Sequence, residues 1–257
     1  MIELMEQLEA CRGSSPRDLF RSALSVEHAA MCDLLDPPEE DALIADPRIA
    51  AKLGACQSVF SRLESAIEKS MADVVRLGGA EMIWADENVS QHYIARYELL
   101  AAKEIELAGI RPNERALFIG SGFLPITAFE YVRQCGCTVD CVDFVPEAII
   151  SSKEITERIG MSDRVRSIQM RGEAHDPSEY DVILVGVLAL PKQEILNHLD
   201  AGVKRGCRVM CRTTYGLRQL IYQRASYDPE ALKRLSPGNR SVARGERVIS
   251  AELLTAS

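Results

Sequence analysis

The stretch that decides the fold is Leu117–Thr127, which reads LFIGSGFLPIT. An apolar run ends in a Gly-Ser-Gly turn and is followed by helical sequence, as at the first strand and helix of a parallel α/β sheet. In a dinucleotide-binding loop a third glycine packs the helix on the strand, and helix amides hold a pyrophosphate. Here Pro125 stands at the place of that glycine. The loop therefore predicts a nucleoside ligand without a pyrophosphate.

Short apolar runs alternate with helical segments from residue 111 onward, which is typical of a parallel sheet whose strands are joined by helices. The run at 180–188 is almost wholly apolar, so we expect it at the centre of the sheet. The last run, at 246–254, is expected to form an antiparallel edge. The other strands are expected at 114–120, 138–143, 164–170 and 207–213, and helices at 125–135, 146–159, 191–203 and 216–223. The pattern predicts a Rossmann-like α/β domain over residues 111–257.

Residues 1–110 show helical patterns and no convincing strand. Apolar side chains recur at three- to four-residue spacing through residues 59–75, and a second amphipathic segment covers 90–108. We therefore expect an all-helical N-terminal domain over residues 1–110, ahead of the Rossmann-like domain.

The composition of the 257-residue chain is ordinary for a globular protein, with 47% hydrophobic and 26% charged residues. A net charge of −8 argues against a broad nucleic-acid-binding surface. No apolar run approaches the roughly 20 residues that a membrane helix needs, and the acidic start does not read as a signal peptide. We expect a cytoplasmic protein that binds neither nucleic acid nor membrane.

Eight cysteines raise the question of a metal site, above all in Cys135-Gly-Cys137 followed by Cys141. No two C-x-x-C pairs stand at zinc-ligand spacing, and Cys141 lies in an apolar strand pattern, where a free cysteine behaves as a small buried hydrophobe. The sequence predicts reduced thiols and no bound metal.

The glycine loop and the end of the second strand together suggest the ligand. Asp143 ends that strand about 20 residues after the loop, where an acidic side chain binds ribose hydroxyls. A nucleoside without pyrophosphate favours S-adenosylmethionine (SAM), a sulfonium cation, over NAD. The alternative is that the glycines only allow a tight turn and Asp143 caps a helix. Glu173, after the third strand, either faces the adenine or is simply solvated.

Several ordered motifs resemble the nicotianamine synthase family and its bacterial relatives, the aminobutanoyltransferases that make opine-type metallophores. IGSGFLPIT resembles the signature G-S-G-x-L-P-x-T, and VDFVPEA resembles the acidic segment that follows it. CRTTYGLRQLIY resembles the block R-x-x-x-G-x-R-x-x-x-Y, while YDVILVGVLAL and ERVISAELL resemble the later strands. HYIARYELLAAKE resembles the Tyr-rich helix and LESAIEK the acidic helix E-x-x-x-E. The match runs from residue 60 to the end.

The resemblance implies an unusual use of SAM. These enzymes transfer the 2-aminobutanoyl (3-amino-3-carboxypropyl) group to the amine of an amino acid and release methylthioadenosine. An amine must lose its proton before it attacks, so a carboxylate is the expected proton acceptor. By resemblance, Glu64 and Tyr93 are the catalytic residues, with Glu68 and Tyr97 as the fallback choices. The alternatives are a solvated helix face for Glu64 and a packing role for Tyr93.

The residues and the resemblance together give the candidate binding residues. The SAM-binding set comprises Gly120, Ser121, Gly122, Leu124, Pro125, Asp143 and Glu173. The residues expected to bind the acceptor or the amino-acid tail of SAM are Arg212, Tyr215, Arg218 and Tyr222. Arginine holds carboxylates in a bidentate way, although each arginine could equally form an ion pair within the protein.

The acceptor is expected to be histidine, of either D or L form, in a single transfer, with an opine dehydrogenase acting downstream. The alternatives are a nicotianamine synthase that repeats the transfer, an ordinary SAM-dependent small-molecule methyltransferase, and a SAM-binding module without catalytic activity.

Overall fold

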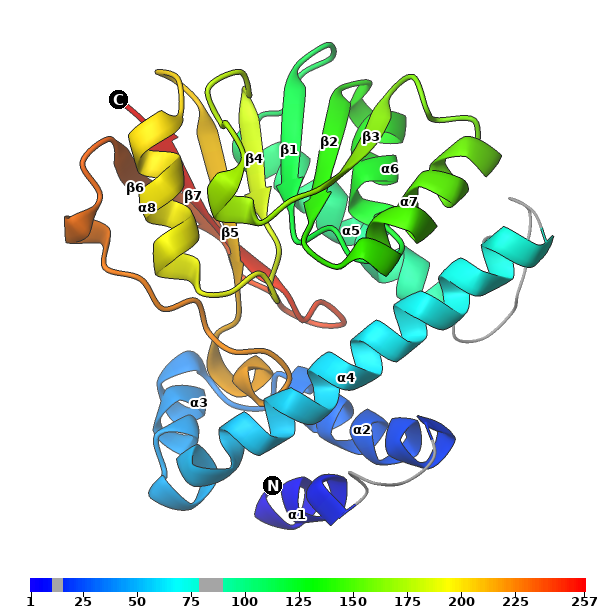
Figure 1. The fold of residues 1–257 in the computed structure, drawn as a ribbon. Coiled ribbons are helices and arrows are strands. Elements are labelled where there is room, and N and C mark those ends of the chain that lie inside the picture. The colour runs from blue at the N-terminus through cyan, green and yellow to red at the C-terminus, as the bar shows by residue number, and fades with distance from the viewer. Residues whose placement is uncertain (11–15, 79–89) are drawn as a thin grey trace. The chain divides into compact units, whose positions relative to one another are not determined.

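Five helices precede the first strand in the computed structural model, which describes residues 1–10, 16–78 and 90–257 (Figure 1). These helices are α1 (Ile2–Ala10), α2 (Pro16–Met31), α3 (Pro37–Ile44), α4 (Pro47–Gly78) and α5 (Ser90–Ala108). Strands and helices then alternate: β1 (Arg115–Ile119), α6 (Ile126–Cys135), β2 (Thr138–Asp143), α7 (Pro146–Arg158), β3 (Val165–Gln169), β4 (Val182–Val185), α8 (Lys192–Gly202) and β5 (Arg208–Thr213). The chain ends with β6 (Leu235–Ser241) and β7 (Ser250–Ala256), and short 3-10 turns lie at η3 (Gly172–Ala174), η4 (Gly216–Leu220) and η5 (Pro229–Ala231).

The strands form one sheet in the order β3-β2-β1-β4-β5-β7-β6. β1 pairs in parallel with β2 on one side and β4 on the other, so that Leu117 stands opposite both Asp140 and Ile183. The connections from β1 and from β3 therefore lead to opposite halves of the sheet. In such sheets ligands bind at the carboxyl ends of the strands beside this change of direction, which is where the glycine loop lies.

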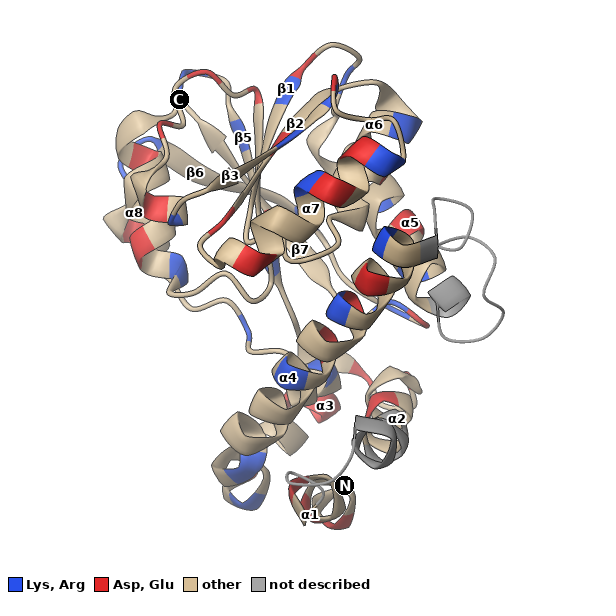
Figure 2. Ribbon diagram, turned by 45° about the vertical axis from the view of Figure 1, so that its right-hand side comes forward, with Lys and Arg blue, Asp and Glu red and all other residues tan. Residues whose placement is uncertain are grey.

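The sheet confirms the predicted Rossmann-like α/β fold class. All four residues of β4 are buried, and three strands flank it on each side, as its apolar sequence predicts. Helices α6 and α7 lie beside the β1–β3 half of the sheet and α8 beside the β4–β5 half (Figure 1). Acidic and basic residues are interspersed along α7 (Figure 2), and Glu154 on that helix pairs with Arg76 of α4.

The predicted antiparallel edge is wrong in one respect. β7 does pair antiparallel, but it lies inside the sheet, and the edge strand is β6. β6 reads LSPGNRS and is mostly exposed, so it shows no apolar alternation. Pro237 and Gly238 argue against a strand in the sheet interior, yet an edge strand tolerates proline because one row of its amides faces outward. The expected helix at 216–223 is the 3-10 turn η4.

The chain divides into two compact units that are interleaved in sequence. The helical unit comprises Met1–Ile67, Thr213–Ala225 and Val242–Ser250, and the sheet unit comprises Glu68–Arg212, Ser226–Ser241 and Ala251–Ser257. The pattern boundary between residues 110 and 111 marks where helices give way to strands. The division by compactness falls elsewhere because the last turns of α4, together with α5, belong to the sheet unit.

One arginine holds the three segments of the helical unit together. Arg218 in η4 is buried and donates to Asp33 Oδ1 at 2.9 Å, to the carbonyl of Arg247 at 2.7 Å and to that of Gly245 at 2.9 Å. Asp33 in turn accepts from the amide of Gly245 at 2.6 Å. These contacts cross-link segments that lie far apart in sequence. Among the described residues, no helix is both long enough and apolar enough to cross a membrane.

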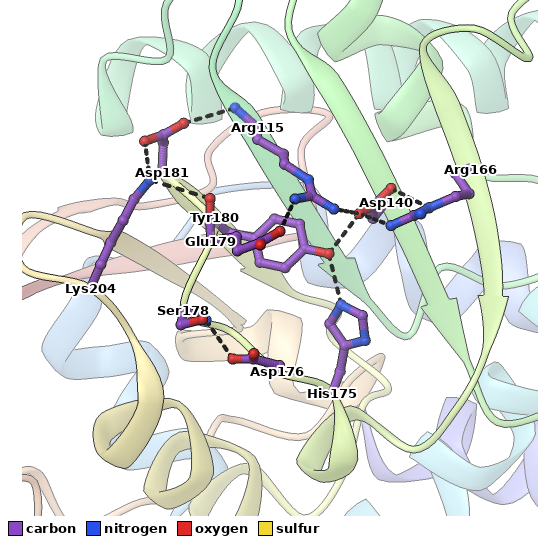
Figure 3. Close-up of polar contacts among 10 residues, drawn as sticks. All are labelled: Arg115, Asp140, Arg166, His175, Asp176, Ser178, Glu179, Tyr180, Asp181 and Lys204. Carbon is purple, nitrogen blue, oxygen red and sulfur yellow. Dashed lines mark hydrogen bonds and ion pairs between the residues drawn. The ribbon is translucent and has the colours of Figure 1, made fainter.

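A polar network links neighbouring strands near their amino ends (Figure 3). The glycine loop lies at the other end of β1. Asp140 on β2 is buried and accepts hydrogen bonds from Arg115 at 2.9 Å, from Arg166 at 2.8 and 3.0 Å, and from the Tyr180 hydroxyl at 2.6 Å. The Tyr180 hydroxyl also meets His175 Nε2 at 2.7 Å. One carboxylate thus joins β1, β2, β3 and Tyr180, which lies two residues before β4.

We expect Asp140→Asn to lower the free energy of unfolding by about 2 kcal/mol at neutral pH, because two arginines lose their shared anion. Burial raises the pKa of Asp140, but hydrogen bonds from Arg166, Tyr180 and Arg115 outweigh it and hold the pKa below 3.8. The carboxylate therefore stabilises the fold above that pH and ceases to do so as the pH falls through its folded pKa. Urea unfolding should show the two proteins converging in stability as the pH drops below 3.8.

The matched control is Asp163→Asn, whose carboxylate is 79% exposed and lies 3.9 Å from Arg164. It should change stability by less than about 0.5 kcal/mol at any of these pH values. An Asp140→Asn protein as stable as this control would show that the network contributes nothing.

Candidate functional site

The glycine loop after β1 has the backbone that only glycine adopts easily. Gly120 and Gly122 have φ angles of 76° and 73°, in the left-handed region. The amides of Gly120 and Ser121 both donate to the carbonyl of Val142, at 2.8 and 3.3 Å. The loop is therefore attached to the end of β2 by its own backbone.

Asp143 strengthens this attachment. Its Oδ2 accepts from the amide of Gly122 at 2.9 Å, and its Oδ1 accepts from the amide of Val145 at 3.0 Å. Each carboxylate oxygen has a second lone pair, so these bonds leave acceptor sites for a hydroxyl group. The sequence predicted a ligand role or a capping role for Asp143. The structure adds a third: Asp143 joins the glycine loop to the segment that begins α7.

The start of α6 offers few free amides to an anion. Pro125 precedes the helix and has no N–H, and the amide of Ile126 donates to the carbonyl of Leu124 at 2.8 Å. Leu124, Ile126 and Thr127 are buried. A dinucleotide site needs these amides for its pyrophosphate, so the local structure agrees with a ligand that has no phosphate.

A carboxylate from α4 lies against the same loop. Glu68 Oε2 accepts from the amide of Phe123 at 3.3 Å, and Glu68 Oε1 accepts from the Tyr93 hydroxyl at 3.4 Å. A Cβ on Gly122 would come within 2.4 Å of Glu68 Oε2, so only glycine leaves room for this approach. The ring of Tyr93 packs on that of Tyr97, with centroids 4.9 Å apart. An anionic group so close to the loop repels a phosphate and attracts a cation.

Apolar side chains follow the neighbouring strands at the same edge of the sheet. The exposed ones are Phe144 after β2, Met170 after β3, and Leu188 and Leu190 after β4. Such side chains suit the faces of an aromatic base. Glu173, in η3 after β3, forms an ion pair with Arg171. A hydrogen bond from its own backbone, together with Arg171, holds the pKa of Glu173 below the usual 4.5.

Arg212, predicted to hold a substrate carboxylate, is buried in an ion pair within the sheet unit. Its Nε and Nη2 donate to Glu104 at 2.7 and 2.9 Å, and Nη2 also donates to Thr127 Oγ1 at 2.8 Å. The Tyr131 hydroxyl donates to Glu104 Oε2 at 2.9 Å. Burial lowers the pKa of Arg212, but the Glu104 carboxylate outweighs it and raises the pKa above the ordinary arginine value. The guanidinium thus has a carboxylate partner of its own.

Glu104 is the last residue of the stretch HYIARYELLAAKE, where it lies in phase with Tyr93 and Tyr97. A sharper signal was present: Leu100, Ala101 and Ala108 form the buried stripe of α5, and Glu104 falls on that stripe. A buried glutamate needs a cationic partner, but the pattern of α5 does not say which cation supplies it.

The remaining predicted residues lie in the helical unit. The Tyr222 hydroxyl donates to Glu64 Oε2 at 2.7 Å, and Tyr222 is buried. Arg224 stacks on Tyr215, with its guanidinium carbon 5.0 Å from the ring centroid. Arg218 donates to Asp33 and to two backbone carbonyls, as described above. The structure therefore joins Glu64 to Tyr222, whereas it joins Glu68 to Tyr93 and the glycine loop. Among the described residues, no group of three or more His, Cys, Asp or Glu side chains could hold a metal ion.

We expect Glu104→Gln to cost about 3–5 kcal/mol of unfolding free energy, because Arg212 would keep its charge and lose its carboxylate partner in a buried environment. The control is Glu106→Gln on the same helix, whose carboxylate is 72% exposed and pairs with Lys103 at 2.8 Å. It should cost less than about 1 kcal/mol. Chemical denaturation measures both, and equal effects would mean that the Arg212–Glu104 pair is not needed for stability.

Comparison with known proteins supports the resemblance seen in the motifs. Residues 91–243, more than half of the chain, match the model of the family described as nicotianamine synthase protein. The sequence is 32% identical over 129 residues to an L-histidine 2-aminobutanoyltransferase of Yersinia pestis, covering 50% of this chain and 48% of that protein. A protein of the same name from Pseudomonas aeruginosa is 27% identical over 119 residues, covering 46% and 45%. The matched region thus spans about half the length of these curated relatives.

Solved structures agree with the fold. The structure of MtNAS in complex with MTA and tNA superposes with a TM-score of 0.88 at 22% identity, covering 99% of this chain and 96% of that one. A variant of MtNAS in complex with S-adenosylmethionine gives the same TM-score and identity, with 99% and 97% covered. The shared fold, the extent of the family match and the loop motif lead to one conclusion: the chain belongs to the nicotianamine synthase family.

Proposed function

We propose that the protein transfers the 2-aminobutanoyl group of SAM to the amine of an amino acid and releases methylthioadenosine. The observation that carries this proposal is that two carboxylates flank the glycine loop. Glu68 lies against Gly122, and Asp143 accepts a hydrogen bond from the Gly122 amide. The names of the relatives from Yersinia and Pseudomonas support the same transfer. The MtNAS complexes with S-adenosylmethionine and with MTA support SAM as co-substrate.

The loop suits SAM for three physical reasons. Amides needed by a pyrophosphate are missing or bonded at Pro125 and Ile126. Asp143 keeps acceptor lone pairs for ribose hydroxyls, while the exposed apolar side chains after β2, β3 and β4 suit an adenine. The Glu68 carboxylate favours a nearby positive charge, and SAM is a sulfonium. We retain Ser121 and Leu124 in the SAM-binding set and keep Glu173 as a candidate for the adenine.

The reaction needs one displacement. The neutral amine nitrogen forms a bond to the γ-carbon of the aminobutanoyl group, the bond from that carbon to sulfur breaks, and its electron pair stays on sulfur. The sulfonium thereby becomes the neutral thioether of methylthioadenosine. The nitrogen gives up one proton, which a carboxylate accepts. The protein's task is to hold the amine in line with the breaking bond.

Glu68 is the better supported proton acceptor. Its carboxylate contacts the loop amide of Phe123 and the Tyr93 hydroxyl, whereas the Glu64 carboxylate accepts from Tyr222. We propose Glu68 and Tyr93 as the catalytic pair, with Glu64 as the alternative that the family resemblance favoured. A tyrosine hydroxyl that donates to the carboxylate orients it and leaves lone pairs for the proton of the amine.

We propose a structural role for the two arginines that the sequence assigned to substrate binding. Arg212 and Arg218 donate to Glu104 and to Asp33, so we propose that they hold elements in position and do not bind the carboxylate of a substrate. Tyr215 and Tyr222 remain candidates for the acceptor side. We propose histidine as the acceptor, from the names of the relatives, in a single transfer. An opine dehydrogenase is the proposed downstream partner, and the cytoplasm, where thiols stay reduced, is the proposed location.

The test is to incubate the protein with SAM and either L- or D-histidine and to identify the products by mass spectrometry. Methylthioadenosine together with histidine carrying one aminobutanoyl group is the expected result. Repeated additions would favour a synthase of the nicotianamine type. S-adenosylhomocysteine with a methylated acceptor would reject the proposal in favour of a methyltransferase, and binding without turnover on a panel of amino acids would favour a SAM-binding module.

We predict that Glu68→Gln lowers kcat by about 10²–10⁴-fold, because the amide cannot accept the proton of the amine. SAM affinity should fall by a smaller factor than kcat, because the variant loses the charge that favours the sulfonium while its side-chain oxygen can still accept from Phe123. Glu64→Gln, four residues earlier on the same helix, is the matched control and should keep most of the activity. Steady-state kinetics with calorimetric SAM binding measure both, and the reverse order of effects would return the catalytic role to Glu64.

A second prediction concerns the space at Gly122. Gly122→Ala and Gly160→Ala each place a side chain at a left-handed φ, 73° and 69°, but nothing lies within 4 Å of the added group at Gly160. Each should cost about 1–2 kcal/mol of stability for the backbone alone. Only Gly122→Ala forces Glu68 away from the loop, so only this variant should lose turnover. Similar activity in the two variants would mean that the close approach of Glu68 is irrelevant.

A further inference from the structure

Lys192, the first residue of α8, is buried, with 2% of its surface exposed, and its ammonium group is bonded to backbone carbonyls. Nζ donates to the carbonyl of Gly186, to that of Ala189 at 2.8 Å and to that of Val187 at 3.3 Å. An ammonium has three N–H donors and no acceptor, so these three carbonyls satisfy it fully. All of them belong to the loop 186–191 between β4 and α8, which we call the β4 loop.

The position of this lysine is unfavourable for two reasons. A positive charge at a helix N-terminus opposes the helix dipole, and burial removes its hydration. Burial and the nearby Arg212 lower the pKa of Lys192 to about 8, with the Cys211 thiol acting in the opposite sense. Natural proteins tend to keep a residue in such an unfavourable position at a functional site. The three carbonyls offset the cost only while the β4 loop keeps its shape.

The β4 loop lies directly against the glycine loop. The amide of Gly186 donates to the carbonyl of Ile119 at 2.8 Å, and a Cβ on Gly186 would come within 2.9 Å of the Gly120 carbonyl oxygen. A Cβ on Gly120 would come within 2.9 Å of Ala189 Cβ. The two loops are therefore so close that neither glycine has room for a side chain. The carbonyl oxygens of the β4 loop meet Lys192, while Leu188 and Leu190 are exposed at the carboxyl edge of the sheet.

We propose that Lys192 is a positioning residue for SAM, which clamps the β4 loop through three carbonyls and thereby holds the backbone of Gly120 and the side chains of Leu188 and Leu190 in place for the nucleoside. The inference rests on the proposed function, because it assigns the nucleoside to this edge of the sheet. Lys192 itself touches no reacting atom and acts through the loop.

The test compares Lys192→Met with Lys204→Met. Methionine keeps the apolar length of the side chain and removes every donor. Lys204 is the matched control, because its Nζ also meets a backbone carbonyl, that of Glu179 at 3.2 Å, and Asp181 at 2.6 Å, but toward the amino ends of the strands. We expect Lys192→Met to weaken SAM binding by about ten- to a hundredfold, as the loss of one or two charge-assisted hydrogen bonds implies. Lys204→Met should bind SAM as the unchanged protein does.

Two further measurements separate positioning from a general loss of structure. Hydrogen exchange of the ligand-free proteins should be faster in the β4 loop of Lys192→Met, at the amides of Gly186 and Ala189, and unchanged there in Lys204→Met. Lys192→Gln, which keeps two N–H donors without the charge, should recover part of the affinity, and KM for SAM should rise more than kcat falls in both Lys192 variants.

The outcomes are distinct for the two proposals. If the unchanged protein binds no SAM, the proposed function fails and this inference fails with it. If the unchanged protein binds SAM while Lys192→Met and Lys204→Met bind it equally well, the proposed function stands and only the role of Lys192 is rejected. If Lys192→Met does not fold, Lys192→Gln decides: normal affinity and normal exchange in the β4 loop would also reject the role.

Discussion

The ion pair between Glu104 and Arg212 is the interaction on which the rest of the sheet unit depends. It is buried, and it joins α5 to β5 while Tyr131 and Thr127 bring α6 into the same group. Thr127 lies in the first turn of α6, directly after the glycine loop, so Arg212 also contacts the point where the loop enters its helix. A buried ion pair of this kind is costly to break because the remaining charge has no water to replace its partner. The elements around the site are thus held by electrostatics that the site itself does not use.

The chemistry of the loop follows from which charges surround it. Asp143 and Glu68 both accept hydrogen bonds from loop amides, and Pro125 removes one further amide. A loop of this shape in a dinucleotide-binding protein uses its amides for a phosphate anion. Here two carboxylates take that place, and the electrostatic preference changes from an anion to a cation. The same glycine turn therefore supports a different ligand because its neighbours, and not its glycines, set the charge.

Local patterns allowed much of the fold to be predicted. β2 has the expected bounds, 138–143, because Val139 and Cys141 alternate with polar residues in a short segment between turns, which is typical of a strand. β6 was missed because Pro237 and Gly238 conceal an edge strand that has almost no buried side chains. The candidate site was predicted unevenly for a similar reason. Gly120, Gly122 and Asp143 are recognisable from spacing along the chain, whereas the choice between Glu64 and Glu68 depends on which turn of α4 meets the loop, and one helix turn separates them.

By itself, the sequence determined the α/β class, the glycine loop, the absence of a phosphate cradle at Pro125 and the family motifs, because each depends on residues close together in the chain. Only the tertiary structure decided the partners of the charged groups. Arg212 and Glu104 are 108 residues apart, and Arg218 meets Asp33 across 185 residues. An arginine in a sequence motif has the same chemistry whether it meets a substrate carboxylate or a protein one. Its partner in the structure is the carboxylate that the fold brings to it, since a charge taken out of water requires a partner wherever the chain can supply one.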